Sequence, residues 1–219
     1  MPRTVIKCDQ LPQLRNAYSY GVKAGGWVFT AGVLGLDGAG KVVGAVPGRP
    51  DVEAQTRQAL RSMTIVLEVL GTSLDRVAKV KGYLTDLRHF DRYNSVYREC
   101  FRPPFPARAT VGNGLVREDA VVEVEAIASV AGTPHEIRAP SLGATDSPLA
   151  LGGTLAGDVL FVSGQLARDA SGTGRNAHQI ARPKLSPRST DRSAHRRSRR
   201  GIRNRRCARN RTGPGRDDR

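Results

Sequence analysis

The stretch that decides the fold is residues 51–84, which read DVEAQTRQALRSMTIVLEVLGTSLDRVAKVKGYL. The apolar residues of its first half recur every three or four positions: Leu60, Met63, Val66, Leu67 and Leu70. This spacing predicts an amphipathic helix, with Asp51 as its N-terminal cap and Gly71 as a left-handed residue just beyond its end. Val77 to Leu84 then reads as a strand. A helix followed by a strand predicts that the apolar face of the helix packs on a sheet.

Four more segments flank this stretch. Residues 27–32, 107–112 and 121–128 are rich in β-forming residues and predict strands. Residues 90–101 carry the spacing of a second amphipathic helix. Strands and helices in this order predict an α+β domain, with a mixed β-sheet and two helices packed on one of its faces.

The basic charge of the chain is concentrated near its C-terminal end. The 219 residues contain 35 Lys and Arg against 20 Asp and Glu, a net charge of +15. Residues 175–219 hold 16 of the basic and 3 of the acidic residues, so this tail carries +13 and the rest of the chain only +2. The totals alone indicate a nucleic-acid binder, but the body of the chain is near neutral.

Several classes of protein are not supported by the sequence. The longest uncharged run near the N-terminus, residues 24–36, is shorter than the ~20 apolar residues of a membrane span, and residues 1–4 lead into no secretory signal. The three cysteines are isolated, and the four histidines lack metal-ligand spacing. We therefore expect a cytoplasmic protein with no membrane contact, no metal and no cofactor.

An internal repeat divides the chain. Residues 21–32, GVKAGGWVFTAG, align with residues 153–164, GTLAGDVLFVSG, at a constant offset of 132. Because this offset equals one domain length, it indicates a tandem copy. We expect a first domain at 1–131, a linker at 132–146 and an incomplete second copy at 147–174.

Residues 175–219 form an Arg-rich tail that we expect to be disordered, because it has too few apolar residues to build a core. Three interpretations of the tail compete. It is an arm that binds nucleic acid non-specifically, a solvated tail with no specific partner, or an out-of-frame translation of GC-rich DNA. The abrupt change of composition inside a repeat favours the third.

The last two predicted strands bring an arginine and a glutamate into one pattern. Alternation places Arg108 and Thr110 on one face of their strand, and Glu123 and Glu125 on one face of theirs. If the two strands form a hairpin with its turn near Leu115, Arg108 lies directly across from Glu123. The pair is then a structural ion pair, or a site where the guanidinium binds a ligand carboxylate and Glu123 handles water. The pattern does not choose between the two.

An ordered set of segments across residues 1–131 resembles the RidA/YjgF family of reactive-intermediate (enamine/imine) deaminases, also labelled L-PSP endoribonucleases. The segments are 18–22 (YSYGV), 29–32 (FTAG), 71–77 (GTSLDRV), 81–87 (KGYLTDL), 93–97 (YNSVY), 105–111 (FPARATV) and 122–128 (VEVEAIA). The resemblance implies a chorismate-mutase-like subunit and a homotrimer with its sites at subunit interfaces.

The resemblance also implies an activity, the hydrolysis of short 2-imino or enamine acids to 2-oxo acids and ammonia. The active-site arginine and the water-handling glutamate of the family fall on Arg108 and Glu123. Its substrate-binding positions fall on the following residues: Tyr18, Ala31, Gly32, Asn94 and Thr110.

One segment departs from the family. Ala31-Gly32-Val33 replaces the common Ser-Gly-Gln, which removes one hydroxyl and one amide from the pocket, whereas the second copy carries Ser163-Gly164-Gln165. This departure leaves open a non-catalytic binder of small carboxylates. The basic tail leaves open a second alternative, a protein that acts by binding RNA or another protein, as a ribonuclease-like or translation-inhibitor-like member of the family would.

Overall fold

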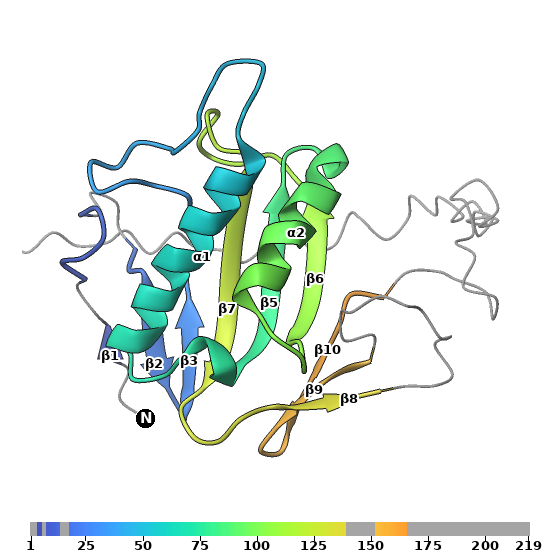
Figure 1. Ribbon diagram of the computed structural model, residues 1–219. Coiled ribbons are helices and arrows are strands. Elements are labelled where there is room, and N and C mark those ends of the chain that lie inside the picture. Colours follow the sequence, from blue (N-terminus) through green and yellow to red (C-terminus); the bar gives the residue numbers. More distant parts are fainter. Residues whose placement is uncertain (1–3, 6–7, 14–17, 139–151, 166–219) are drawn as a thin grey trace, which may run out of the picture. The chain divides into compact units, whose positions relative to one another are not determined.

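The computed structural model describes residues 4–5, 8–13, 18–138 and 152–165 (Figure 1). All of them belong to one unit of the chain, Met1–Asn176. The predicted Arg-rich tail at 175–219 lies outside the described residues, as do parts of the predicted linker and second copy.

The main sheet is mixed. Its strand order is β1-β2-β3-β7-β5-β6, and a short strand, β4, pairs with β7. Only the β5–β6 pair is parallel. The strands are β1 (Thr4–Val5), β2 (Gly21–Ala24), β3 (Trp27–Thr30), β4 (Val33–Leu34), β5 (Val77–Leu84), β6 (Ala107–Gly112) and β7 (Val122–Ser129).

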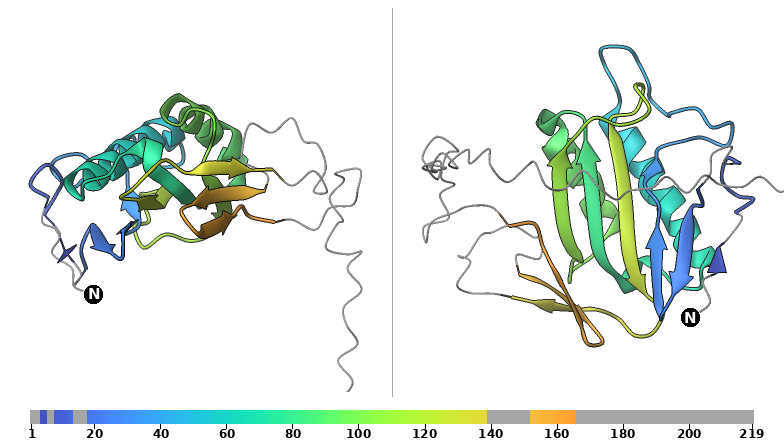
Figure 2. Two further views of the ribbon diagram at one scale, coloured as in Figure 1. Left: turned by 90° about the horizontal axis from the view of Figure 1, so that it is seen from below. Right: turned by 180° about the vertical axis from the view of Figure 1, so that it is seen from behind.

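Two helices, α1 (Val52–Val69) and α2 (Phe90–Cys100), cover one face of this sheet and leave the other face open (Figure 2). Single turns of 3-10 helix, η1 (Leu74–Arg76) and η2 (Leu87–His89), precede β5 and α2. The predicted α+β fold class, a mixed sheet with two helices on one face, is confirmed. No helix in the described ranges is long and apolar enough to cross a membrane.

Both predicted ends of α1 are confirmed. The carboxylate of Asp51 accepts a hydrogen bond of 3.0 Å from the amide of Ala54, which satisfies a donor that the first turn leaves free. Gly71 adopts a φ of 81° after the last apolar residue of the helix. Between these ends, Leu60, Met63 and Val66 are fully buried against the sheet.

The predicted hairpin between β6 and β7 is wrong, because β5 lies between these strands. The connection, residues 113–121, is longer than the roughly two to five residues of a hairpin loop. It passes the end of β5, where the amide of Asn113 donates to Leu84 and the amide of Thr85 donates to Val121. β7 thereby enters the sheet between β5 and β3.

The register decides which face each side chain occupies, because residues paired across strands point to the same side. Arg108 pairs with Val80, and Val80 pairs with Ala126, whose side chain lies in the core under the helices. Glu123 pairs with Tyr83, and the side chains of this pair point to the opposite face of the sheet from those of Arg108, Val80 and Ala126. The expectation that Arg108 and Glu123 face each other within one chain is therefore wrong. Arg108 points to the helix face and Glu123 to the open face.

A separate three-stranded sheet follows, with the order β10-β9-β8. Its strands are β8 (His135–Ile137), β9 (Gly153–Ala156) and β10 (Val159–Val162). β8 lies inside the segment predicted as a linker. The order of these strands repeats that of β3, β2 and β1 in the main sheet.

The β9–β10 hairpin has the same geometry as the β2–β3 hairpin 132 residues earlier. Both pairs of strands have bounds that differ by 132, and both pair in the same register. The first turn glycine has a φ of 58° at Gly25 and 60° at Gly157. The amide that follows each hairpin donates to the carbonyl that precedes it, at 2.8 Å for Ala31 and 3.1 Å for Ser163.

Candidate functional site

Arg108 is a buried cation held by α2. Its side chain comes from β6, and the residue is only 7% exposed. One guanidinium nitrogen, Nη2, donates a 2.8 Å hydrogen bond to Oδ1 of Asn94. Its Cζ atom lies 4.5, 5.4 and 5.6 Å from the ring centroids of Tyr97, Tyr93 and Phe90. These distances are those of cation–π contacts.

No carboxylate among the described residues forms an ion pair with this guanidinium. Burial lowers the pKa of Arg108, and the nearby charge of Arg98 lowers it further, although arginine remains protonated at neutral pH. Its second nitrogen, Nη1, is buried and makes no hydrogen bond with a described residue. A buried charge without a counter-ion is costly, so the burial of Arg108 lowers the stability of the fold.

Other buried polar atoms around Arg108 also have no hydrogen-bond partner in the described part of the chain: the hydroxyls of Tyr93, Tyr97 and Thr110. Burial raises the pKa of Tyr93 to about 12, with the charge of Arg108 acting in the opposite direction. Both tyrosines therefore stay protonated at neutral pH and can donate hydrogen bonds. Together with Nη1, they form a group of buried polar atoms whose hydrogen-bonding capacity is not used within the described part of the chain.

The local sequence explains how these side chains meet. Phe90, Tyr93, Asn94 and Tyr97 follow the 3–4 spacing that places residues on one face of a helix. On the facing strand, Gly82 leaves space, because a Cβ there would lie 2.7 Å from the Tyr93 hydroxyl. Of these residues, only Asn94 was predicted as a site residue from the sequence. The aromatic spacing in 90–97 is the signal that could have identified the others.

A second group of predicted site residues lies on the open face of the sheet and contains Glu123, Gly32 and Ala31. The carboxylate of Glu123 lies against Gly32, where a Cβ would overlap Oε1 of Glu123, so a larger residue at this position would displace the carboxylate. Burial and then the charge of Glu125 raise the pKa of Glu123. Ala31 precedes Gly32 and binds through its amide to the carbonyl of Tyr20.

The structure thus divides the predicted site residues into two groups. Arg108 and Asn94 are hydrogen-bonded, and Thr110 follows two residues after Arg108 on the same face of β6. Gly32 and Glu123 are in contact, with Ala31 beside them in the chain. The sheet separates the two groups. Tyr18 is 51% exposed.

The segment after β10 lies along β6 at Arg108. The amide of Gly164 donates to the carbonyl of Arg108 at 2.8 Å, and the amide of Arg108 donates to the hydroxyl of Ser163 at 3.3 Å. One residue earlier, the amide of Ala107 donates to the hydroxyl of Thr154 at 2.7 Å. Ser163-Gly164-Gln165 stands out in the sequence as the family-like segment of the second copy, but no local pattern predicts its contact with Arg108.

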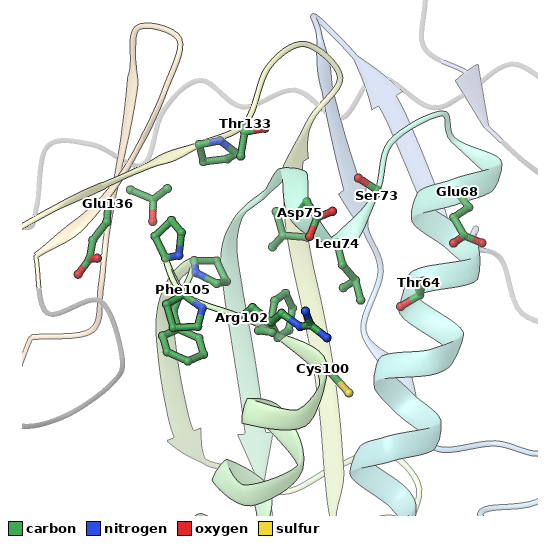
Figure 3. Close-up of a pocket in the computed structure, with 17 residues that line it drawn as sticks. Thr64, Glu68, Ser73, Leu74, Asp75, Cys100, Arg102, Phe105, Thr133 and Glu136 are labelled. Atoms are coloured by element: carbon green, nitrogen blue, oxygen red, sulfur yellow. The ribbon is translucent and has the colours of Figure 1, made fainter.

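A cavity of about 640 Å³ lies elsewhere, between α1, the end of α2 and the residues around β8 (Figure 3). Glu68, Cys100, Arg102 and Glu136 are among its lining residues, but neither Arg108 nor Glu123 is. The cavity therefore does not coincide with the predicted site. The described residues contain no group of three or more His, Cys, Asp or Glu side chains arranged to hold a metal ion.

Known proteins resemble this chain over more than half of its length. A RutC family protein of Pyrococcus horikoshii is 37% identical over 127 residues, which are 58% of this chain and 97% of the relative. A 2-iminobutanoate/2-iminopropanoate deaminase of Dermatophagoides farinae is 32% identical over 126 residues, 58% of this chain and 95% of the relative. The crystal structure of E. coli TdcF with bound serine superposes with a TM-score of 0.52 at 28% identity, and the match covers 57% of this chain and 98% of that one.

The family model described as endoribonuclease L-PSP matches residues 8–130. This range contains both groups of site residues, and it makes up more than half of the chain. The chain therefore belongs to the endoribonuclease L-PSP family, which is also the RidA/YjgF family.

Proposed function

We propose that this protein is a hydrolytic deaminase that converts short 2-imino acids, and their enamine tautomers, into 2-oxo acids and ammonia. The observation that carries the proposal is the buried guanidinium of Arg108, with Nη1 unbonded and no carboxylate paired to it among the described residues. Such a site fits a small carboxylate, which accepts two parallel hydrogen bonds from arginine. TdcF, whose structure contains serine, shows that a protein of similar fold binds a small carboxylate.

The proposed assembly is a homotrimer in which the site forms between subunits. Glu123 and Arg108 project from opposite faces of one sheet, so Glu123 must come from a second chain if the two act together. The β9–β10 hairpin supports this arrangement, because it shares the register of β2–β3 and ends beside Arg108. A β2–β3 hairpin of a second chain docked in the same way would bring Gly32, and Glu123 in contact with it, to Arg108.

In this site Arg108 holds the carboxylate of the 2-imino acid and fixes the position of the C=N carbon. Glu123 takes a proton from a water molecule as the oxygen of that water adds to the carbon. Glu123 passes this proton to the nitrogen, which gives a tetrahedral carbinolamine. It then transfers the remaining hydroxyl proton to the same nitrogen as the C–N bond breaks, so ammonia leaves and the 2-oxo acid forms. One imino acid and one water thus give one 2-oxo acid and one ammonia. The raised pKa of Glu123 makes its carboxylate a stronger base than that of an exposed glutamate.

A second candidate, a carboxylate binder without turnover, is favoured by one observation. Ala31 and Val33 stand where the resembled family has a hydroxyl and an amide, so the open-face group offers fewer hydrogen bonds to water and substrate. The two candidates differ in a direct measurement. A binder gives a heat of binding with pyruvate or serine in calorimetry but does not accelerate imine hydrolysis.

We expect Arg108→Ala to abolish hydrolysis of 2-iminopropanoate, because the substrate loses the group that orients it. The imine is generated by an amino-acid dehydratase, and its loss is followed by trapping with semicarbazide over a series of protein concentrations. The helix content should persist, because the substitution also removes a buried unpaired charge. The matched control is Arg57→Ala, which removes an exposed arginine paired with Glu99 and should leave the rate unchanged. Equal rates for Arg108→Ala and the parent would refute the mechanism.

A further inference from the structure

The outer edge of β6 at Arg108 is covered by another segment of the same chain. Gly164 and Ser163 hydrogen-bond to the backbone of Arg108, and Thr154 to that of Ala107. On the open face of the sheet, Nζ of Lys79 donates to the carbonyl of Val162. We call the described residues 153–165 the capping segment, and the β6 edge with Trp27 and Lys79 the docking surface.

An aromatic contact anchors the capping segment. The ring of Phe161 packs edge-on against Trp27 of β3, with 5.1 Å between the ring centroids. The residue 132 positions earlier, Phe29, occupies the same place in the β2–β3 hairpin and is 42% exposed. The β2–β3 hairpin of a second chain would therefore present an equivalent aromatic ring to Trp27.

The capping segment fits the docking surface better than a β2–β3 hairpin would. Thr154 and Ser163 accept hydrogen bonds from the backbone of β6, whereas the corresponding first-copy residues are Val22 and Ala31, which have no hydroxyl. The capping segment is also part of the same chain. Tethering gives a local concentration on the order of millimolar, which exceeds that of a second chain at micromolar protein.

We propose that the capping segment occupies, within the chain, the surface on which the β2–β3 hairpin of a second copy docks, and so holds the chain in a capped state. The catalytic consequence rests on the proposed function. The only acidic residue of the segment, Asp158, lies in the hairpin turn, so the capped site has Arg108 without a water-handling carboxylate. Release of the segment exposes the edge, and a second chain then supplies Glu123.

The test uses the full-length chain with Phe161→Asp, which places a charge against Trp27 and weakens the capping segment without altering the first domain. Leu160→Asp is the matched control, because Leu160 is in the same strand but 53% exposed. The oligomeric state is measured by sedimentation, and the imine hydrolase rate is measured on the same samples. The parent and Leu160→Asp should be mainly monomeric at micromolar protein. Phe161→Asp should form trimers and gain about tenfold or more in turnover, as expected when a millimolar intramolecular competitor is removed.

Trp27 gives a further readout, because it is the single tryptophan of the chain. Its fluorescence in the parent should not depend on protein concentration, since Phe161 contacts it within the chain. In Phe161→Asp the emission should change as concentration rises and Phe29 of a second chain arrives. Adding Phe29→Asp to Phe161→Asp should abolish both the concentration dependence and the trimer.

The double variant Thr154→Val with Ser163→Ala gives the capping segment the residues of the first hairpin and should shift the parent partly towards trimers. A parent that is already a fully active trimer, or a Phe161→Asp chain that stays monomeric, overturns the proposal. The experiment gives a different result if the capping proposal is right but the proposed deaminase function is wrong. In that case Phe161→Asp forms trimers with the expected change in Trp27 emission, but no variant accelerates imine hydrolysis.

Discussion

At the scale of single residues, the decisive feature is a buried arginine whose counter-charge is absent from the described part of the chain. A buried ion that lacks a partner costs several kcal/mol, of order 3–5 when a buried pair is broken. Three aromatic rings and the Asn94 amide oxygen offset part of this cost for Arg108. Under the proposed function, the remainder is recovered when the carboxylate of the substrate binds. The guanidinium would then lower stability in the free protein and provide affinity for the substrate.

The ionised carboxylate of Glu123 also costs free energy to bury. The pH dependence of the protein's stability tests the direction of this effect. Burial raises the pKa of Glu123 above its ordinary 4.5, so the folded chain holds a proton that the unfolded chain has already released. Stability therefore falls as pH rises from the ordinary pKa through the raised one, and the full penalty persists above that interval. We expect Glu123→Gln to melt at a higher temperature than the parent at pH 7, with the difference lost near pH 4.

The same substitution should lower the rate of imine hydrolysis, because glutamine cannot take a proton from water. In the parent the rate should rise with pH through the raised pKa of Glu123, and in Glu123→Gln this rise should be absent. Glu118→Gln is the control, since Glu118 is an exposed carboxylate. If Glu123→Gln melts at a lower temperature than the parent at pH 7, burial of the ionised Glu123 carboxylate does not destabilise the fold and the assignment is wrong.

At the scale of elements, the contact between β5 and α2 shapes the arginine site. Gly82 of β5 faces Tyr93 of α2, and no other residue type leaves the tyrosine hydroxyl in place. The parallel β5–β6 pair then sets Thr110 beside Gly82, and Arg108 beside Val80. The strand–helix–strand unit thus carries the whole group around Arg108.

We expect Gly82→Ala to destabilise the protein by about 1–3 kcal/mol, the usual cost of overpacking a core. A Cβ at this position would lie 2.7 Å from the Tyr93 hydroxyl and 3.0 Å from its Cζ atom, so the ring must shift. Urea unfolding measures the change. Gly114→Ala is the matched control, because a Cβ there meets no atom within 4 Å. A Gly82→Ala midpoint equal to that of the control would show that Tyr93 moves freely.

At the scale of the whole molecule, the charge and the chemistry occupy different parts of the chain. The site residues lie in the near-neutral body, whereas residues 175–219 carry a net charge of +13. Deletion of 175–219 should leave imine hydrolysis unchanged and remove any retention of nucleic acid at low salt. Both are measured on the same preparation. A full chain that retains nucleic acid but does not hydrolyse the imine, together with a deletion variant that loses this retention, would favour the RNA-binding alternative.

Much of the local structure could be predicted because it depends on neighbouring residues. The spacing of apolar residues determined α1, and Asp51 and Gly71 marked its ends. Alternation along β6 correctly placed Arg108 and Thr110 on one face, and alternation along β7 did the same for Glu123 and Glu125. These properties repeat every two to four residues, so a short window of sequence contains them.

Strand order was decided only by the tertiary structure. The choice of β5 rather than β7 as the neighbour of β6 depends on packing between residues far apart in the chain, which no local pattern encodes. That choice put Arg108 under α2 and Glu123 on the opposite face, and it left the β6 edge open to Ser163 and Gly164. The sequence by itself thus determined which residues could act, through their chemistry and spacing. The long-range pairing of strands determined which of them meet.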